Sequence, residues 1–250
     1  MILKKDYQHS ASSANSFMDS PLYWLITKVF KFEDKLNPRM IMGSAAEAGA
    51  YHALIKPGRK DTAIKRYVKT KFIKLGGSEE DAECSWAQTI ALKFRDNLQE
   101  FGDLVSYQKE IITPGKKYGL KYPIRSFTDF EFKDLIIDTK ATAWIRRSKA
   151  GKPLYHPKEP DIRQQILYKD IYKKDTMLLY CSKDDVHTTD MVDRDHYLEP
   201  MIQIFKNIEH LNKICETPMD AFKILPLNFE NFRWKSGNAK EFAIKLMREV

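Results

Sequence analysis

Three ionisable side chains in the segment 128–142, TDFEFKDLIIDTKAT, are spaced so that they could do chemistry together. The apolar runs FEF and LII flank a polar dipeptide, and this pattern predicts a tight β-hairpin with the dipeptide as its loop. In that register Asp129 lies directly opposite Asp138, and Lys140 lies two residues further along the second strand. All three side chains are therefore expected on one face of the sheet, together with Glu131.

Two carboxylates that face each other across a hairpin need a compensating charge, because like charges in this position destabilise a sheet. A solvated sheet face is one solution, and most acidic residues on strands are no more than that. A buried pair instead requires a cation or a metal ion. Carboxylate oxygens are ligands that Mg²⁺ prefers, and a neighbouring lysine can stabilise charge on a phosphate or orient a water for attack. The residue types alone leave the solvated face and a metal-dependent phosphodiesterase site as open alternatives.

The whole chain is typical of a folded protein with a sizeable core. Its 250 residues are 43% hydrophobic and 30% charged, and the formal net charge of +8 suggests a polyanionic partner. No apolar run is long enough to span a membrane, and none resembles a signal peptide. The three cysteines, Cys84, Cys181 and Cys215, are scattered and odd in number, which argues against a disulfide framework and favours a reducing compartment.

The periodicity of the sequence predicts one α/β domain over residues 1–250. Residues 1–102 are expected to be mainly helical and to form an N-terminal cap, although residues 1–16 are polar and predicted to be loosely held. Residues 103–192 should form the sheet core, and residues 193–250 further helices. The predicted fold class is a central mixed β-sheet with an antiparallel meander, flanked by helices.

The hairpin residues resemble the signature of the PD-(D/E)XK nuclease superfamily. Asp129 is followed, after eight residues, by Asp138, Thr139 and Lys140. Upstream, the sequence GSAAE (residues 43–47) lies in a predicted helix. Its Glu47 stands where relatives of the RecB nuclease domain and of lambda exonuclease carry an acidic or histidine metal ligand.

A downstream segment extends the resemblance. The sequence QQILY, which begins at Gln164, resembles the Q-x-x-x-Y helix motif of the RecB-like branch, with Gln164 and Tyr168 one turn apart on a single face. Four elements in the expected order, spread over about half the chain, are more specific than any one of them. The resemblance implies a restriction-endonuclease-like core.

The resemblance also implies roles for individual residues. The implied metal ligands are Glu47, Asp129, Asp138 and the carbonyl of Thr139. Lys140 would position or activate the attacking water, and Gln164 would contact the site or the DNA. The implied catalytic set is Glu47, Asp129, Asp138, Lys140 and Gln164.

Contacts with DNA are expected from residues around this set. Tyr168 would support the site and lie near the nucleic acid. The segment that follows the second hairpin strand carries Trp144, Arg146, Arg147 and Lys149, a mixture that suits a flexible loop holding phosphates and stacking a base.

The sequence departs from the family pattern in informative places. Thr128 replaces the proline that often precedes the first aspartate. Iron–sulfur members of this branch use four cysteines, but Ser20 stands where the first is expected, and Cys215 alone lies near the C-terminus. A cluster with four thiolate ligands cannot be built from three cysteines. The expected cofactor is therefore Mg²⁺ or Mn²⁺, without an iron–sulfur cluster.

A second group of possible ligands, which consists of His187, Asp190, Asp193, Asp195 and His196, competes for the role of a metal site. It lies between a predicted strand and a predicted helix, where aspartate is a favoured capping and turn residue. A solvated turn is the preferred interpretation.

The resulting prediction is a Mg²⁺- or Mn²⁺-dependent deoxyribonuclease, with an exonuclease of recombination, repair or phage DNA metabolism as the first choice. An endonuclease with the same core, directed by structure or sequence, and a non-catalytic DNA-binding subunit are the alternatives. The expected partners are DNA ends, single- or double-stranded, and a second copy of the chain or a recombination protein. No membrane association is expected, and the predicted location is the cytoplasm of a bacterial or phage-infected cell.

Overall fold

The computed structural model of the chain describes residues 2–33, 36–147, 153–154, 157–235 and 238–248. The chain divides into two compact units. Unit 1 contains residues 1–35, 110–126 and 195–250, and unit 2 contains residues 36–109 and 127–194. The prediction of a single domain over residues 1–250 stays a prediction. The segment 1–102, expected as one helical cap, is shared between the two units.

A five-stranded mixed sheet confirms the predicted α/β class. In sheet order its strands are β1 (Ser106–Thr113), β2 (Ile124–Glu131), β3 (Leu135–Ala141), β6 (Asp175–Cys181) and β7 (Val186–Asp190). Strand β3 runs antiparallel to β2 and parallel to β6, and β6 runs antiparallel to β7. Helix α6 (Glu159–Tyr172) connects the two parallel strands, because a parallel pair needs a crossover that a short turn cannot supply.

The β2–β3 hairpin has the register that the sequence predicts. Phe130 lies opposite Ile137, and Glu131 lies opposite Ile136. The backbone N–H of Phe132 donates to the carbonyl oxygen of Leu135 at 2.8 Å, which closes a two-residue loop. The alternation of side chains then fixes which residues of β3 face each side of the sheet.

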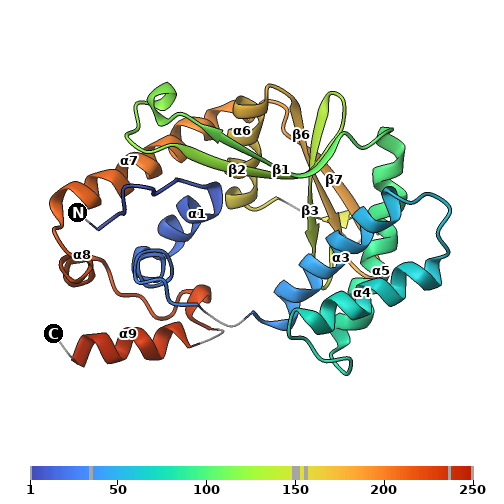
Figure 1. Cartoon of the computed structure of the whole chain (residues 1–250), viewed down its shortest axis with the longest axis horizontal. Helices are drawn as coiled ribbons and strands as arrows, with labels where there is room; N and C mark the ends of the chain where they lie inside the picture. The colour runs from blue at the N-terminus through green and yellow to red at the C-terminus, as the bar shows by residue number, and fades with distance from the viewer. Residues whose placement is uncertain (1, 34–35, 148–152, 155–156, 236–237, 249–250) are drawn as a thin grey trace. The chain divides into compact units, whose positions relative to one another are not determined.

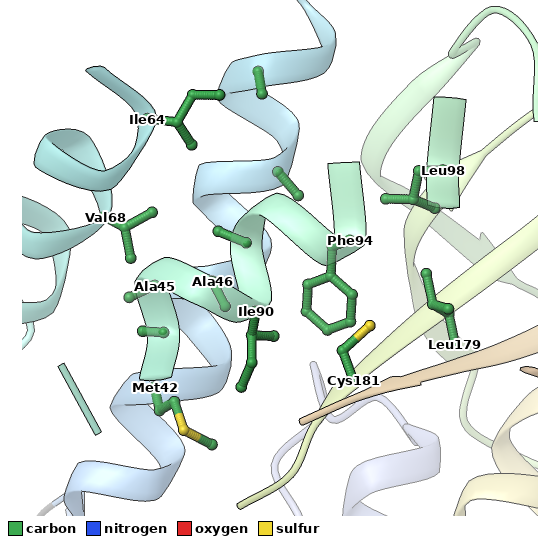
Figure 2. Close-up of a cluster of buried hydrophobic side chains, with 14 of the residues drawn as sticks. Met42, Ala45, Ala46, Ile64, Val68, Ile90, Phe94, Leu98, Leu179 and Cys181 are labelled. Carbon is green, nitrogen blue, oxygen red and sulfur yellow. The ribbon is translucent and has the colours of Figure 1, made fainter. Parts of the chain in front are cut away.

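Helices α3 (Pro38–Leu54), α4 (Asp61–Lys74) and α5 (Ala82–Leu98) lie side by side next to strands β3 and β6 in unit 2 (Figure 1). Figure 2 shows their apolar side chains meeting Leu179 and Cys181 of β6. The small residues of α3 let it pack closely on α4 and α5. A methyl group built at Gly49 would stand 2.2 Å from Cγ2 of Val68 and 3.0 Å from Cβ of Ala91.

Unit 1 is mainly helical. Its helices are α1 (Ala11–Asp19), α2 (Pro21–Trp24), the π-helical turn η1 (Leu25–Val29), α7 (Leu198–Ile214), α8 (Pro218–Ile224) and α9 (Ala239–Arg248). The short 3₁₀ turns of the whole chain are η2 (Gln99–Phe101), η3 (Gly115–Tyr118), η4 (Asp195–Tyr197) and η5 (Phe232–Trp234).

The expectation that residues 1–16 are loosely held is wrong. Helix α1 begins at Ala11, and the polar side chains that suggested a loose segment are used inside the unit. Ser13 accepts a hydrogen bond from the indole N–H of Trp24 at 2.8 Å, and the backbone N–H of Leu3 donates to Oδ1 of Asn212 at 2.8 Å. Serine is typical of loops in a sequence, but its hydroxyl can equally satisfy a buried donor.

In the part of the chain that the structure describes, no helix is both long and apolar enough to cross a lipid bilayer.

The packing at Gly49 predicts opposite effects for one substitution at two glycines of α3. Gly49→Ala should lower the free energy of unfolding by about 1–3 kcal/mol, because the new methyl group overpacks against α4 and α5. Gly43→Ala should be neutral or stabilising by up to about 1 kcal/mol, because its methyl would meet only Ala141, at 3.9 Å, and alanine favours the helix. Chemical denaturation of both variants measures the difference, and equal effects would contradict this account of the packing.

Candidate functional site

Asp138 is the centre of a polar cluster in unit 2 that the hairpin brings together. Its carboxylate is buried, and both oxygens have a partner. The side-chain amide of Gln164 donates to Oδ1 at 3.0 Å, and the ammonium of Lys140 stands 2.5 Å from Oδ2. Lys140 and Asp138 point to the same face because they are two residues apart on β3, and α6 brings Gln164 over that face.

Asp129 lies on β2, directly before Phe130, whose partner on β3 is Ile137. Its Oδ2 accepts a hydrogen bond from the backbone N–H of Thr139 at 2.9 Å and another from the Thr139 hydroxyl at 3.3 Å. These two donors orient the carboxylate without adding a positive charge. Repulsion from Glu47 and Asp138 is therefore offset mainly by the single ammonium of Lys140.

Glu47 reaches this cluster from α3 and is held by two consecutive residues of β1. The side-chain amide of Gln108 donates to Oε1 of Glu47 at 3.1 Å, and the hydroxyl of Tyr107 also forms a hydrogen bond with this carboxylate. The Tyr107 ring stacks on Tyr51, with centroids 4.0 Å apart and planes at 12°. Glu47 and Tyr51 lie one turn apart on α3, so this helix positions both the carboxylate and the support of its partner.

The backbone at Gln108 explains how neighbouring residues share one partner. Successive side chains of a regular strand point to opposite faces, so Tyr107 and Gln108 could not both reach Glu47 from ideal strand geometry. Gln108 has φ of 50°, in the left-handed region, which costs about 1–2 kcal/mol for a residue other than glycine. The sequence carries no glycine or asparagine to signal this departure. Tyr107 and Gln108 were therefore missed as site residues.

Burial has the largest effect on the carboxylates of the cluster, and repulsion between them adds to it. Burial raises the pKa of Asp129 to about 7, and the charge of Glu47 adds to this effect. Burial likewise raises the pKa of Asp138 to about 7, with Lys140 acting in the opposite direction. The pKa of Glu47 is raised by burial and by the charge of Asp138.

Asp161 is a fourth carboxylate at the site that the sequence did not reveal. It lies in the first turn of α6, with Oδ1 3.8 Å from the Lys140 ammonium, and its Oδ2 accepts a hydrogen bond from the Tyr180 hydroxyl at 3.0 Å. The charges of Asp138, Asp161 and Asp129 together raise the pKa of Lys140 despite its burial. An acidic residue at a helix start is ordinarily a capping feature, so its type and position gave no signal of this role.

Glu131 lies on the same face of the hairpin as the cluster, but its negative charge is fully compensated by neighbouring groups. It accepts a hydrogen bond from Ser106 at 2.6 Å and forms ion pairs with Lys109 at 2.9 Å and Lys174 at 2.8 Å. Burial alone would raise the pKa of Glu131, but these donors lower the pKa to about 2. Glu131 is therefore a saturated structural ion-pair site.

The structure divides the remaining predicted DNA contacts. Tyr168 lies one turn after Gln164 but is only 6% exposed, so its position suits support of the site better than contact with a ligand. Trp144 is exposed. Arg146 and Arg147 form a short strand, β4, paired with β5 (Pro153–Leu154), where a flexible loop was expected. Lys149 lies outside the described residues.

The run of histidine and aspartate residues after β6 forms an edge strand and a turn. His187 and Asp190 belong to β7, which pairs with β6, and Asp193 has φ of 56° in the turn that follows. The interpretation of this run as a solvated turn agrees with the placement of Asp193, whereas His187 and Asp190 lie in a strand. Cys84 and Cys181 in unit 2 and Cys215 in unit 1 are buried free thiols.

The donor set fits a hard divalent cation in its chemistry more clearly than in its geometry. Within the residues described, no group of three or more His, Cys, Asp or Glu side chains is arranged to hold a metal ion. The carboxylates of Glu47, Asp129 and Asp138 are nevertheless the ligand type that Mg²⁺ and Mn²⁺ prefer. Their raised pKa values show that each is destabilised in its charged form, a cost that a bound cation would remove.

Comparison with known proteins assigns no family. No family model matches the sequence, and no curated protein matches it. Eight chains of solved structures match. One, described as "Crystal structure of SSO0001", is 11% identical and has a TM-score of 0.36 over 84% of this chain and 92% of that chain. A likeness this weak supports no argument about fold or function.

The raised pKa of Asp138 predicts how its replacement changes stability with pH. A carboxyl whose pKa rises from 3.8 to about 7 on folding costs stability as pH increases between these values, and the cost is constant above them. Asp138→Asn removes this cost. In metal-free buffer at pH 8 the free energy of unfolding of Asp138→Asn should exceed that of the parent by about 1–2 kcal/mol. A pKa shift of about three units corresponds to ~4 kcal/mol, but part of this gain is lost because Lys140 loses its nearest partner.

The same comparison well below pH 3.8 supplies the internal control, since both forms of residue 138 are then neutral in the folded and unfolded states. Asp134→Asn, in the exposed hairpin loop, is the matched control and should show no such pH-dependent gain. A constant difference between Asp138→Asn and the parent from pH 4 to pH 8 would exclude a raised Asp138 pKa.

Proposed function

We propose that this protein is a divalent-metal-dependent nuclease that hydrolyses DNA phosphodiester bonds and has a PD-(D/E)XK-like core. The observation that carries the proposal is the convergence of Glu47, Asp129, Asp138, Lys140 and Gln164 from α3, β2, β3 and α6. A solvated sheet face would leave these groups exposed with ordinary pKa values. Instead Asp138 is buried, and the pKa of each of the three carboxylates is raised.

The lysine has a defined part in this proposal. Asp138 and Asp161 keep the ammonium of Lys140 charged, because each raises its pKa. Lys140 is therefore unsuited to act as a general base near neutral pH, since it has no neutral form available. It is suited to stabilise negative charge that develops on a phosphate and to orient a water by donating a hydrogen bond.

The carboxylates and the amide complete the set. Gln164 holds the rotamer of Asp138 through Oδ1, and Thr139 holds Asp129 through Oδ2, so both carboxylates are oriented before any ligand arrives. Glu47, Asp129 and Asp138 would hold the cation. When bound, such an ion supplies Lewis-acid stabilisation and lowers the pKa of a coordinated water.

DNA as the substrate is supported by the charge of unit 2 as well as by the chain total of +8. Helix α4 carries the exposed cations Lys65, Arg66 and Lys74. Exposed lysines and arginines bind the phosphate backbone without reading its sequence, which suits an enzyme of DNA recombination, repair or phage DNA metabolism. The proposed place of action is the cytoplasm of a bacterial or phage-infected cell.

Two substitutions in β3 test the catalytic assignment. Asp138→Asn and Lys140→Ala should each reduce cleavage of linear DNA by roughly 10²–10³-fold in Mg²⁺ or Mn²⁺. The first removes a charged ligand of the cation, and the second removes a positive charge that would act at the scissile phosphate. The parent activity should disappear in the presence of a chelator.

The exposed hairpin loop supplies matched controls, since Lys133→Ala and Asp134→Asn make the same chemical changes in the same hairpin and should cleave normally. Circular dichroism and thermal melting establish that all four variants fold. Undiminished cleavage by a folded Asp138→Asn preparation, free of host nucleases, would refute the site.

A requirement for a DNA end is the second test, and exonuclease action is the favoured form of the proposal. Covalently closed circles should remain intact while linear DNA of the same sequence is shortened progressively from its end. Rising salt should slow the reaction, since backbone contacts dominate binding. Cleavage of single-stranded or duplex circles at the rate of the linear form would replace the exonuclease by an endonuclease.

A further inference from the structure

Unit 1 contains a second concentration of unsatisfied charge, of the opposite sign. A cavity of about 490 Å³ is lined by the N-terminal segment, by the turn after α2 and by the start of β2. Four of its lining side chains are cationic and one is acidic. The cations are Lys4, Lys28, Lys31 and Arg125, and the acid is Asp6.

The lysines of this cavity are exposed, and the part of the protein that the structure describes does not neutralise them. Among the described residues no ion pair involves Lys4, Lys28 or Lys31, whereas Arg125 donates to Glu110 at 2.5 Å. The pKa of Lys28 is lowered by burial and then by repulsion from Lys31 and Arg233. Cations that repel one another cost stability, and an anion bound among them would remove that cost.

The local backbone brings two of the cations together. Lys28 lies in the π-helical turn η1, in which the N–H of Phe30 reaches the carbonyl oxygen of Leu25 at 3.0 Å. Lys31 follows immediately with φ of 61°, a left-handed conformation that costs about 1–2 kcal/mol outside glycine. π-Helical turns and strained residues are rare and often mark functional positions.

The cavity wall is also firmly held, so the site is built before a ligand binds. The backbone of His9 is bonded on both sides to the start of β2: its N–H donates to Pro123 and its carbonyl accepts from Arg125, both at 2.8 Å. The buried His9 ring contacts Glu209 at 3.0 Å, and Glu209 accepts the backbone N–H of Lys121 at 2.8 Å. These bonds fix the N-terminal segment relative to Arg125.

Hydroxyl-bearing residues also line the cavity beside the cations. They are Tyr7, Ser10 and Ser13. Ammonium groups and hydroxyls together are typical of a phosphate site that acts through charge without reading sequence. The volume is far larger than a single phosphate ion needs and is in the range of sites that hold a nucleotide-sized ligand.

We propose that this cavity binds phosphates of a nucleic-acid backbone, so that unit 1 holds a strand of the DNA that unit 2 cleaves. The inference rests on the proposed nuclease function for its choice of nucleic acid over other phosphate compounds. It assigns to Lys28 and Lys31 a binding role that is separate from the catalytic cluster.

Binding of a fluorescent single-stranded oligonucleotide of about 20 nucleotides tests the proposal. The measurement uses the Asp138→Asn background in chelator, so that cleavage does not consume the probe. Lys28→Gln combined with Lys31→Gln should weaken binding by about 25-fold near 0.1 M salt, or about fivefold for each phosphate that is no longer neutralised. The slope of log affinity against log salt should fall in magnitude by about 1.4, or about 0.7 for each such phosphate on a single strand.

Two control pairs separate local contact from net charge. Lys28→Arg with Lys31→Arg keeps both charges and should bind within about threefold of the background protein. Lys235→Gln with Lys245→Gln removes two exposed charges of unit 1 outside the cavity and should leave the salt slope unchanged. If the cavity pair and this outer pair behave alike, the cavity proposal is refuted.

A thermal-shift measurement with small phosphate compounds distinguishes the possible sources of phosphate. Inorganic phosphate or a mononucleotide, each measured by thermal shift, should stabilise the background protein only weakly. If the glutamine pair abolishes a strong response to either small molecule but leaves oligonucleotide affinity intact, the cavity is a small-phosphate site and the nucleic-acid proposal fails.

The outcomes also separate this inference from the nuclease proposal. Loss of oligonucleotide binding in the glutamine pair, with no cleavage by the parent under any metal, would retain the cavity and reject the nuclease. Normal binding by the glutamine pair, with metal-dependent cleavage by the parent, would retain the nuclease and reject the cavity.

Discussion

The repulsion between Asp129 and Asp138 on the two strands of one hairpin is the constraint on which the site depends. Each residue lies on a strand, directly beyond the pair that Phe130 forms with Ile137, so the protein cannot relax this repulsion by moving a loop. It must supply compensation from elsewhere. Lys140 does so from the same strand, and Gln164 and Thr139 add dipoles. The compensation is incomplete, because the pKa of each aspartate remains near 7.

Glu131 shows that the fold does not force the charge of a buried carboxylate on this hairpin to remain incompletely compensated. It lies on the same face of the same hairpin and is also buried. Two lysines and one hydroxyl contact it, and its pKa falls to about 2. Among the described residues, the four carboxylates around Lys140 share one ammonium, whereas the single carboxylate of Glu131 has two. A site built only for stability would resemble the Glu131 arrangement, so the deficit of positive charge around Asp138 is the feature that calls for a ligand.

The sequence predicted the parts of this arrangement that depend on local chain geometry. A two-residue loop between apolar runs permits one register, and the residue pattern alone is enough to pair Phe130 with Ile137 and Glu131 with Ile136. The spacing of Gln164 and Tyr168 on one helix face was equally local. Partners that depend on non-local geometry were out of reach. Tyr107 and Gln108 share Glu47 because of a left-handed residue that no sequence signal announces, and Asp161 meets Lys140 because α6 crosses the sheet.

The two units apply one electrostatic principle with opposite signs. Holding like charges close together is unfavourable, and a bound ligand of the opposite charge relieves their repulsion. In unit 2 the excess is negative and hard, which suits a divalent cation. In unit 1 the excess around Lys28 and Lys31 is positive and lined with hydroxyls, which suits a phosphate. A metal ion and a phosphodiester are the two components that hydrolysis of a nucleic acid must bring together, so both excess charges favour the same chemistry.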